Sequence, residues 1–394
     1  MIAMEFEEVK EKSKKYLFQN YGRIDLSFTH GKGCMLYGSD GKEYLDLVAG
    51  IAVNSLGYAH PDVTRAIQEQ ASRMLHVSNL YYVEEQANLA ERIASIAPEG
   101  LDRTLFVNSG AEANEGALKT AVRKTGRGKV LSALNGFHGR TSASLGATGQ
   151  EKYQRTFEPL ISDAYQYYEL GNCEQIKSMV TKDTAAVMVE PIQGEGGVRT
   201  ASEEFFRTVR DVCTDKGALM VCDEVQTGIG RTGEWYGIQN YGVVPDIITM
   251  AKALGGGLPI GAVTTTEEIS SVMTPGTHGT TFGGNPMVCA AGCAVIDAMK
   301  RDGIVPHAKE MGERWIRDLK GIGSPKIKEV RGRGLIIGVE MESNEAAAGV
   351  QAYCRENGVL VNVCHGNTVR LIPPLILDDK QKDRFTSLLK ERLS

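Results

Sequence analysis

Short apolar runs alternate with amphipathic stretches through the middle of the chain. From about Thr104 the apolar runs have the length of strands, and helical patterns such as 112–123 and 203–213 fall between several of them. The predicted strands are 104–107, 130–133, 185–189, 218–222, 247–250 and 261–264. Continuous apolar strands that alternate with amphipathic helices are typical of an α/β fold with a mostly parallel central sheet covered by helices. Ligands bind beyond the carboxyl ends of the strands in such sheets, so we expect the functional site there.

The pattern differs at the two ends of the chain. An amphipathic helix is predicted over 4–20, and two strands around a turn at 39–42 form a hairpin before a helix that begins at Pro61. Beyond Asn285 the pattern predicts long helices, short strands and a last helix from Asp378, which indicates a smaller α+β domain. The helices are 285–300 and 305–319, and the strands are 326–330, 335–341, 359–363 and 369–372. We therefore expect an N-terminal segment (1–50) packed with the small domain, a large domain (51–290) that binds the cofactor, and a small C-terminal domain (291–394).

Composition narrows the class of protein. Apolar residues make up 42% and charged residues 24% of the 394 residues, which is an ordinary globular balance. A net charge of −5 without a basic block disfavours a nucleic-acid binder, and the apolar runs are too short to cross a bilayer. The acids among the first residues disfavour a targeting peptide. The eight cysteines and seven histidines show no metal-binding spacing. These features predict a cytoplasmic protein without a structural metal.

Two charges of opposite sign end neighbouring apolar runs. Asp223 follows the run 218–222, and Lys252 follows 247–250 and precedes a glycine-rich segment. A lysine at a strand end is usually solvated, but here the packed surroundings favour a buried, nucleophilic amine. A carboxylate and an amine at adjacent strand ends suit pyridoxal 5'-phosphate: Lys252 would form a covalent Schiff base with it, and Asp223 would keep its ring nitrogen protonated.

The run 108–115 could bind the phosphate of that cofactor. It opens the helix predicted at 112–123, and the small residues Ser109, Gly110 and Ala111 leave backbone N–H groups free at the positive end of the helix dipole. Simple N-capping by Asn108 or Ser109 explains the same residues equally well when they are taken alone. Only the presence of Asp223 and Lys252 favours a phosphate site.

Two further strand ends carry candidate ligand contacts. Phe137 offers a ring for stacking and Arg140 a fork for a carboxylate, although a core phenylalanine and a surface arginine in a turn are the better interpretation in isolation. Glu190 and Glu195 flank a glycine-rich loop and could equally be solvated acids. The run 228–233 matches Gly-x-Gly-x-x-Gly, but no clear helix follows it, so a dinucleotide site is disfavoured.

The order of these segments resembles the class III aminotransferases of the fold-type I pyridoxal-phosphate enzymes, and within them the acetylornithine aminotransferases. The resemblance extends from the hairpin to the last strand and rests on many segments in the same order. They are 54–61, 76–82, 108–115, 137–140, 223–233, 251–261, 278–286 and 369–375.

The resemblance implies roles for individual residues. Lys252 and Asp223 would be catalytic, Gln226 would contact the ring hydroxyl and Phe137 would stack on the ring. Thr281 would reach the phosphate from a second subunit, which implies a homodimer with shared active sites. Arg140 would bind the donor's carboxylate, and Arg370 the α-carboxylate of glutamate, with Glu195 covering Arg370 in the other half-reaction. The resemblance also places Ser109, Gly110, Ala111, Glu224 and Val225 at the cofactor and Thr280 at the substrate.

The implied reaction moves the terminal amino group of N2-acetyl-L-ornithine to 2-oxoglutarate and gives N-acetyl-L-glutamate 5-semialdehyde and L-glutamate, a step of arginine biosynthesis. The segments 78–82 and 361–363 favour this donor. Ornithine, 4-aminobutyrate, N-succinyl-diaminopimelate and a lysine-pathway intermediate stay open as donors, as does an aminomutase. A catalytically silent cofactor-binding protein is the alternative of another class, and the intact set of Lys252, Asp223 and Arg140 disfavours it.

Overall fold

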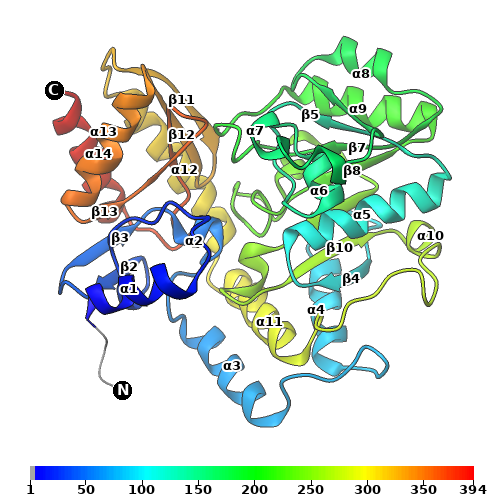
Figure 1. Ribbon diagram of the computed structural model, residues 1–394, viewed down its shortest axis with the longest axis horizontal. Coiled ribbons are helices and arrows are strands. Elements are labelled where there is room, and N and C mark those ends of the chain that lie inside the picture. Colours follow the sequence, from blue (N-terminus) through cyan, green and yellow to red (C-terminus); the bar gives the residue numbers. More distant parts are fainter. Residues whose placement is uncertain (1–4) are drawn as a thin grey trace.

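A seven-stranded sheet forms the centre of the larger part of the molecule in the computed structural model, which describes residues 5–394 (Figure 1). Its order is β4 (Arg103–Val107), β10 (Gly261–Thr265), β9 (Ile247–Met250), β8 (Leu219–Asp223), β7 (Thr184–Val189), β5 (Lys129–Ala133) and β6 (Tyr165–Tyr168). All neighbouring strands are parallel except β10, which is antiparallel to both β4 and β9. The predicted mostly parallel sheet is confirmed. The edge strand β6 was not predicted, because its tyrosines and glutamine lack a continuous apolar run.

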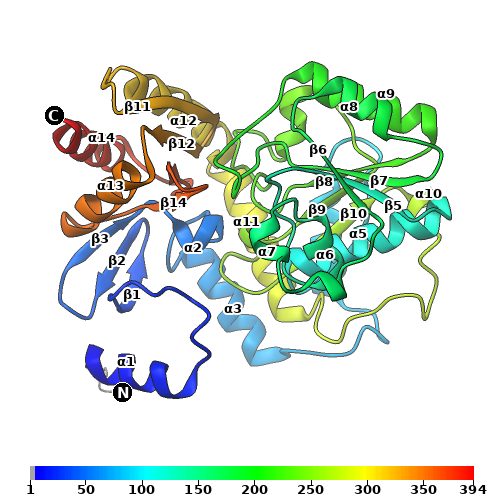
Figure 2. The same cartoon turned by 45° about the horizontal axis from the view of Figure 1, so that its top comes forward.

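Both faces of this sheet are buried, which explains the continuous apolar runs. On β7, Ala186 and Met188 pack with α5 (Gly110–Thr125), whereas Val187 and Val189 belong to the core that contains Phe205 of α9 (Glu203–Lys216). Successive side chains of a strand point to opposite faces, so a strand covered on both sides needs apolar residues at every position. Figure 2 shows α8 (Cys173–Met179) and α9 on one side of the sheet and α5 and α6 (Ser142–Ala147) on the other.

The smaller part of the molecule contains two four-stranded sheets. One is antiparallel, in the order β11 (Ile327–Arg333), β12 (Ile336–Met341), β15 (Thr368–Leu371) and β14 (Asn362–Cys364). The other has the order β1 (Phe28–Lys32), β2 (Met35–Gly38), β3 (Glu43–Asp46) and β13 (Val359–Leu360). The helices α12 (Ile304–Lys320) and α13 (Asn344–Glu356) pack with these strands, and α14 (Asp379–Leu393) packs on α12 and α13.

The predicted strand 359–363 is two strands. Its first half, β13, pairs in parallel with β3 of the N-terminal hairpin, and its second half, β14, pairs antiparallel with β15. The chain changes sheets at Val361, so one apolar run joins the N-terminal hairpin to the C-terminal sheet. A period-2 pattern describes both halves and contains no information on which partner each half pairs with.

The remaining elements connect these sheets. They are α1 (Phe6–Tyr16), α2 (Ala49–Ala52), α3 (Pro61–Arg73), α4 (Glu84–Ala94), α7 (Glu151–Gln154), α10 (Glu267–Ser270), α11 (Pro286–Arg301) and the 3₁₀ turns η1 (Glu158–Leu160), η2 (Gly237–Tyr241) and η3 (Lys252–Gly255). The helix predicted over 4–20 ends at Tyr16, since the Gln19 side chain donates to the carbonyls of Ser13, Lys14 and Leu17. The predicted first residue of this helix, Met4, lies outside the described residues. Helix α11 packs on α3 and α4 and crosses the predicted domain boundary at 290.

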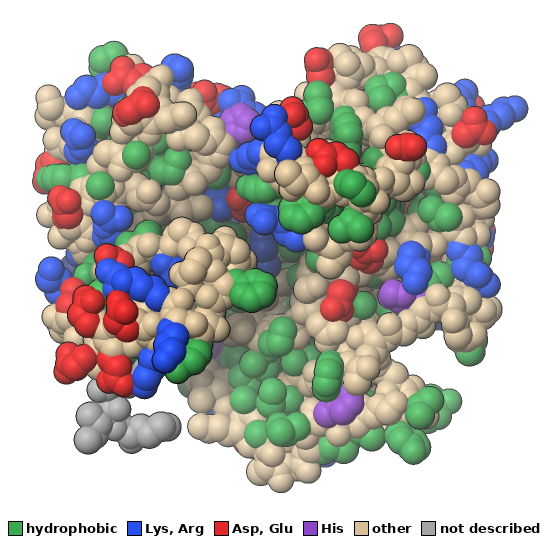
Figure 3. All heavy atoms as spheres, in the orientation of Figure 1, with side chains coloured by type: hydrophobic (Ala, Val, Ile, Leu, Met, Phe, Trp, Pro, Cys, Tyr) green, Lys and Arg blue, Asp and Glu red, His purple; other side chains and the backbone are tan. Residues whose placement is uncertain are grey.

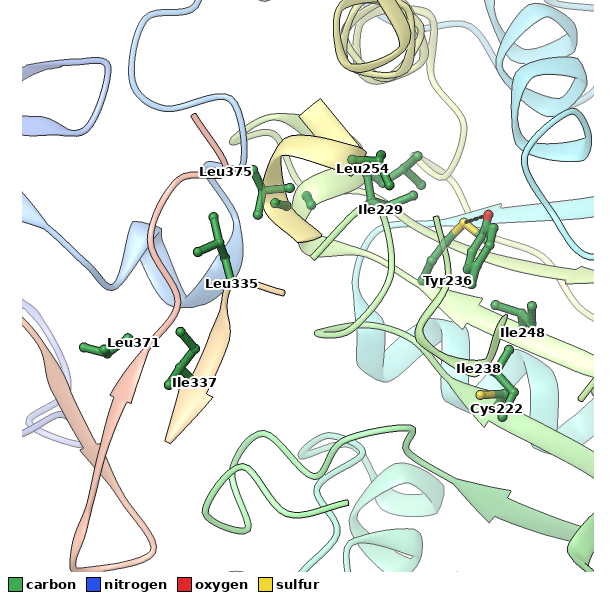
Figure 4. Close-up of a cluster of buried hydrophobic side chains, with 14 of the residues drawn as sticks. Cys222, Ile229, Tyr236, Ile238, Ile248, Leu254, Leu335, Ile337, Leu371 and Leu375 are labelled. Atoms are coloured by element: carbon green, nitrogen blue, oxygen red, sulfur yellow. Dashed lines mark hydrogen bonds between the residues drawn. The ribbon is translucent and has the colours of Figure 1, made fainter. Parts of the chain in front are cut away.

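The two parts share one apolar core. Figure 4 shows Leu335 and Leu375 from the smaller part facing Ile229 and Leu254 from the larger part, and all four are buried. The guanidinium of Arg231 is buried in the same region and donates to the carbonyls of Leu335 and Pro373. The glycine-rich run 228–233 therefore joins the two parts of the molecule, which explains its glycines without a dinucleotide. Among residues 5–394, no helix is long and apolar enough to span a membrane.

Candidate active site

A cavity of about 490 Å³ lies where the carboxyl ends of the central strands meet the smaller part of the molecule. Segments that follow β4, β5, β7, β8 and β9 all contribute to its lining. Figure 3 shows a hollow between the two halves of the molecule with basic side chains inside it. Lys252 and Asp223 both line the cavity, as the sequence predicted for strand ends that share one edge of a sheet.

Lys252 is the first residue of η3, directly after β9, and its φ is +46°. A left-handed backbone is costly for a residue with a side chain and is kept only where the surrounding structure requires it. Burial, assisted by the charge of Arg370, lowers the pKa of Lys252 to about 8, against the opposing charges of Glu195, Asp223 and Glu190. A substantial fraction of the amine is therefore unprotonated, and hence nucleophilic, near neutral pH.

Asp223 ends β8 and is held by three donors. Its Oδ2 accepts from Asn114 Nδ2 at 2.7 Å and lies 2.7 Å from His138 Nδ1, and its Oδ1 accepts from the backbone N–H of Val225 at 3.0 Å. The side chain is only 4% exposed. Asn114 also accepts a bond from Thr249 on β9, so the carboxylate is fixed from several directions. This arrangement keeps one buried acceptor pointing at the cavity in a defined orientation.

Sequence reasoning missed His138 and Asn114. His138 stands next to Phe137 in a segment that was noted only for its neighbours, and Asn114 is a buried amide among the small residues of α5. A polar side chain on the apolar face of a helix was the available signal, because buried amides need partners. The identity of the partner, Asp223, depends on the packing of α5 against β8.

The start of α5 lines the cavity with Ser109, Gly110 and Ala111. Ser109 is the N-cap, and its hydroxyl accepts from the N–H of Glu112 at 3.2 Å, so the predicted capping alternative is realised. The cap leaves the first N–H groups of the helix without intrahelical partners, which is the usual basis of an anion site. Only glycine fits at 110, because a Cβ there would lie 2.7 Å from Val225 Cγ1.

Phe137 and Arg140 lie on another wall of the cavity. The Arg140 guanidinium stacks 4.4 Å from the centre of the Tyr153 ring and 5.7 Å from that of Phe137. The two rings meet edge to face at 5.6 Å. This aromatic pair orients an exposed arginine without using its hydrogen-bond donors, so the guanidinium is available to an anionic ligand.

Arg370, on β15, is paired with Glu195. The distance between Arg370 Nη1 and Glu195 Oε1 is 2.6 Å, and the same nitrogen donates to Gln226 Oε1 at 3.0 Å. Burial would raise the pKa of Glu195, but the charge and hydrogen bond of Arg370 outweigh it and lower that pKa. Glu195 and Gln226 line the cavity, whereas Arg370 is covered by them and only 1% exposed.

Besides Arg370, three predicted residues lie outside the lining of this cavity. Glu224 points away from it, since its carboxylate accepts from Thr227 and from the N–H groups of Gly237 and Ile238; it is a structural acid in this chain. Thr280 bonds Asn108 at 3.0 Å, and Thr281 is exposed. The single chain does not bring either threonine to the cavity.

Comparison with known proteins gives the family of this fold and site. The family model "Aminotransferase class-III" matches residues 16–393. The acetylornithine aminotransferase of Aquifex aeolicus is 44% identical over 96% of this chain and all of its own, and that of Methanothermobacter thermautotrophicus is 42% identical over 99% and 100%. The ornithine aminotransferase of Toxoplasma gondii has 31% identity and a TM-score of 0.94, and covers 100% of this chain and 96% of its own.

The chain belongs to the class III aminotransferases, and it is a pyridoxal-phosphate-dependent enzyme of fold type I. A further structure of the Toxoplasma enzyme, also with a TM-score of 0.94, shows pyridoxal phosphate at partial occupancy in its active site. The residues of the present cavity fit this cofactor: they combine an amine of lowered pKa, a buried carboxylate and a helix start suited to a phosphate.

Proposed function

We propose that this aminotransferase acts on N2-acetyl-L-ornithine and 2-oxoglutarate and forms N-acetyl-L-glutamate 5-semialdehyde and L-glutamate in arginine biosynthesis. The relatives with 41–44% identity over nearly the whole chain are acetylornithine aminotransferases. The observation that carries the proposal is the pair of arginines. Arg140 is available to a carboxylate, whereas Arg370 is covered by Glu195.

Each wall of the cavity has a role in this proposal. Lys252 Nζ would attach the cofactor and, once free, would move the proton from the substrate carbon that bears the amine. Asp223 would keep the ring nitrogen protonated, Phe137 would stack on the ring and Gln226 would contact its hydroxyl. The start of α5 would hold the phosphate. When bound, pyridoxal phosphate supplies the carbonyl for the amine and a conjugated ring that accepts electrons from the substrate carbon.

The two half-reactions need different charges near the reacting carbon. Acetylornithine carries no carboxylate on that carbon, and an uncovered arginine there would be left without a partner. Glutamate does carry one, and Glu195 must then move from Arg370 for that carboxylate to bind. Arg140 binds the distant carboxylate of each substrate. The same cavity can thus accept both substrates, because the Glu195–Arg370 ion pair opens for glutamate and stays closed for acetylornithine.

The proposal includes a homodimer with shared sites. Exposed apolar side chains gather in 74–82 and at Phe282, and the contact between the rings of His76 and Phe282 brings these segments together. Thr281 is the exposed neighbour of Phe282 and would reach the phosphate of a second subunit, with Thr280 near its substrate.

We also propose the division into domains at residues 50 and 290, with the β3–β13 pairing in support of the N-terminal assignment. The eight free thiols are compatible with a cytoplasmic location.

A panel of amine donors with 2-oxoglutarate tests the proposal. We expect the highest kcat/KM for acetylornithine and lower values for ornithine, 4-aminobutyrate and N-succinyl-diaminopimelate. Ornithine is the second candidate, because the structures of high similarity include ornithine aminotransferases. A higher kcat/KM for ornithine would replace the proposed donor. Turnover that needs no 2-oxoglutarate would indicate an aminomutase instead.

A further inference from the structure

A second buried acid, Glu190, lies at the wall of the cavity near His138. Glu190 follows β7, lines the cavity and is only 7% exposed. Its Oε1 accepts from the backbone N–H of Phe137 at 3.0 Å, so the acid is tied to the residue before His138. No step of the proposed mechanism uses this carboxylate.

The His138 ring contacts Asp223 and has Glu190 as a neighbour. Its Nδ1 is 2.7 Å from Asp223 Oδ2, and its side chain is only 1% exposed. Its Nε2 and the Oε1 of Glu190 each lie 3.3 Å from the position that a Cβ on Gly136 would occupy, so the two atoms are neighbours, although no direct hydrogen bond joins them. The three side chains come from the ends of β5, β7 and β8, three adjacent strands in Figure 1.

The charges around the ring favour its protonated form. Burial opposes a charge on the imidazole, but the hydrogen bond and charge of Asp223, together with the charge of Glu190, outweigh it and raise the pKa of His138. Burial also raises the pKa of Glu190, against the attraction of His138. The charge of Lys252 interacts with both acids of this cluster, and Glu195 and Arg370 interact with Lys252 in turn.

We propose that His138 and Glu190 are positioning residues that hold Asp223 as a carboxylate through an imidazolium that bonds Asp223 and is stabilised by the nearby charge of Glu190. A neutral imidazole could still donate to Asp223, but it would not balance the carboxylate's charge in a buried site. The charge of Glu190 also favours the cationic ring. The inference rests on the proposed contact of Asp223 with the ring nitrogen of the cofactor and is independent of the amine donor.

The imidazole can be followed directly by NMR in the full-length holoenzyme labelled at histidine Cε1. The signal that disappears in His138→Asn is assigned to His138, and its shift is recorded from pH 6 to 10. We expect the imidazolium shift at pH 7 in the wild type. In Glu190→Gln the midpoint of the titration should move to lower pH, because one of the two anions is lost while the acceptor for Phe137 N–H is kept. A neutral ring at pH 7 in the wild type would overturn the inference.

Glu224→Gln is the matched control. Glu224 is also a fully buried acid whose pKa is raised by burial, but its carboxylate bonds Thr227, Gly237 and Ile238. This control should leave the His138 midpoint unchanged, and an equal shift in both variants would refute a specific role for Glu190. If Glu190→Gln does not fold, the wild-type titration still decides, because His138 should show a second inflection as Glu190 ionises; a single inflection would count against the pairing.

The dissociation constant of pyridoxal phosphate provides a readout that a purely structural role would not change. In Glu190→Gln, the affinity for pyridoxal phosphate should fall as the pH rises through the lowered His138 midpoint. The wild type and Glu224→Gln should keep their affinity for the cofactor over the same pH range. A pH-independent affinity in Glu190→Gln would contradict the inference. The donor panel tests the substrate separately, since a different preferred donor would overturn the proposed substrate and leave the histidine titration unaffected.

Discussion

Glu195 Oε1 lies 2.6 Å from Arg370 Nη1 and closes the guanidinium off from the cavity. The two residues come from the loop after β7 and from β15, so the pair links the larger and smaller parts of the molecule. The pKa of Glu195 is lowered, so this acid stays ionised as the pH falls to values below its ordinary pKa. The pair is therefore intact throughout the neutral range, and a substrate must displace Glu195 to reach Arg370.

Removing this acid should change substrate preference. In Glu195→Ala, Arg370 loses its ionic partner at the cavity, and glutamate should gain over acetylornithine by at least about tenfold in relative kcat/KM, the factor that about 1.4 kcal/mol produces. Half-reaction rates measured by the absorbance of the cofactor give this ratio. Glu195→Gln keeps the shape and should lie between the wild type and the alanine variant. An unchanged ratio in Glu195→Ala would contradict the covering role.

Cofactor capture should depend on the titration of Lys252. The pKa of this amine is lowered to about 8, so its reactive, unprotonated form increases as the pH rises through about 8 rather than through its ordinary value near 10.5. The rate at which the apo-protein captures pyridoxal phosphate, followed by stopped-flow absorbance from pH 6.5 to 10, should show this midpoint. Lys252→Ala should bind the cofactor without capture and should have no transaminase activity. A midpoint above 10 in the wild type would show that the amine is not desolvated in solution.

Tyr153 should orient Arg140. Tyr153→Leu removes the stacked ring and should raise KM for a carboxylate-bearing donor about two- to fivefold with little change in kcat, since an exposed cation–π contact contributes about 0.5–1 kcal/mol. Tyr153→Phe retains the ring and should behave as the wild type. KM for an alkylamine without a carboxylate is the internal control. An equal rise for that amine would indicate a general disturbance of the cavity.

Shared active sites can be tested by complementation. Thr281→Asp would place a negative charge beside the phosphate of the other subunit, and Lys252→Ala removes the attachment point in its own subunit. Each variant alone should be inactive. Co-expression should restore activity, because a mixed dimer has one site with both Lys252 and Thr281. Activity of Thr281→Asp by itself would show that this residue does not approach the phosphate, and a monomer in sedimentation would exclude the shared site.

The hydrophobic pattern allowed most of the fold to be predicted because buried strands must be apolar on both faces. All the predicted strands of the central sheet are present, and the strand ends carry Asp223 and Lys252 as expected. The hydrophobic pattern did not predict β6, since its tyrosines and glutamine do not form a continuous apolar run. It extended the first helix too far, because a glutamine side chain that caps the helix ends it earlier than the periodicity suggests.

The candidate site was predictable where a residue type has one evident chemical use. The resemblance implied that Glu195 covers Arg370, and the structure brings Glu195 Oε1 to 2.6 Å from Arg370 Nη1. Glu224 was misplaced, since adjacent residues at a strand end can point in opposite directions and only packing decides which one faces the cavity. The partner of His138 could not be predicted, because β5 and β8 are separated by β7 in the sheet and by many residues in the chain.

The sequence by itself determined the local structure and the set of reactive groups: apolar periodicity specifies strands and helices, and side-chain chemistry limits what Lys252, Asp223 and Arg140 can do. Only the tertiary structure decided which of these groups share one cavity, which acid covers Arg370 and which imidazole supports Asp223. Those relationships depend on strand order and on distances of a few ångströms. Residues far apart in the chain set both, so no local pattern contains them.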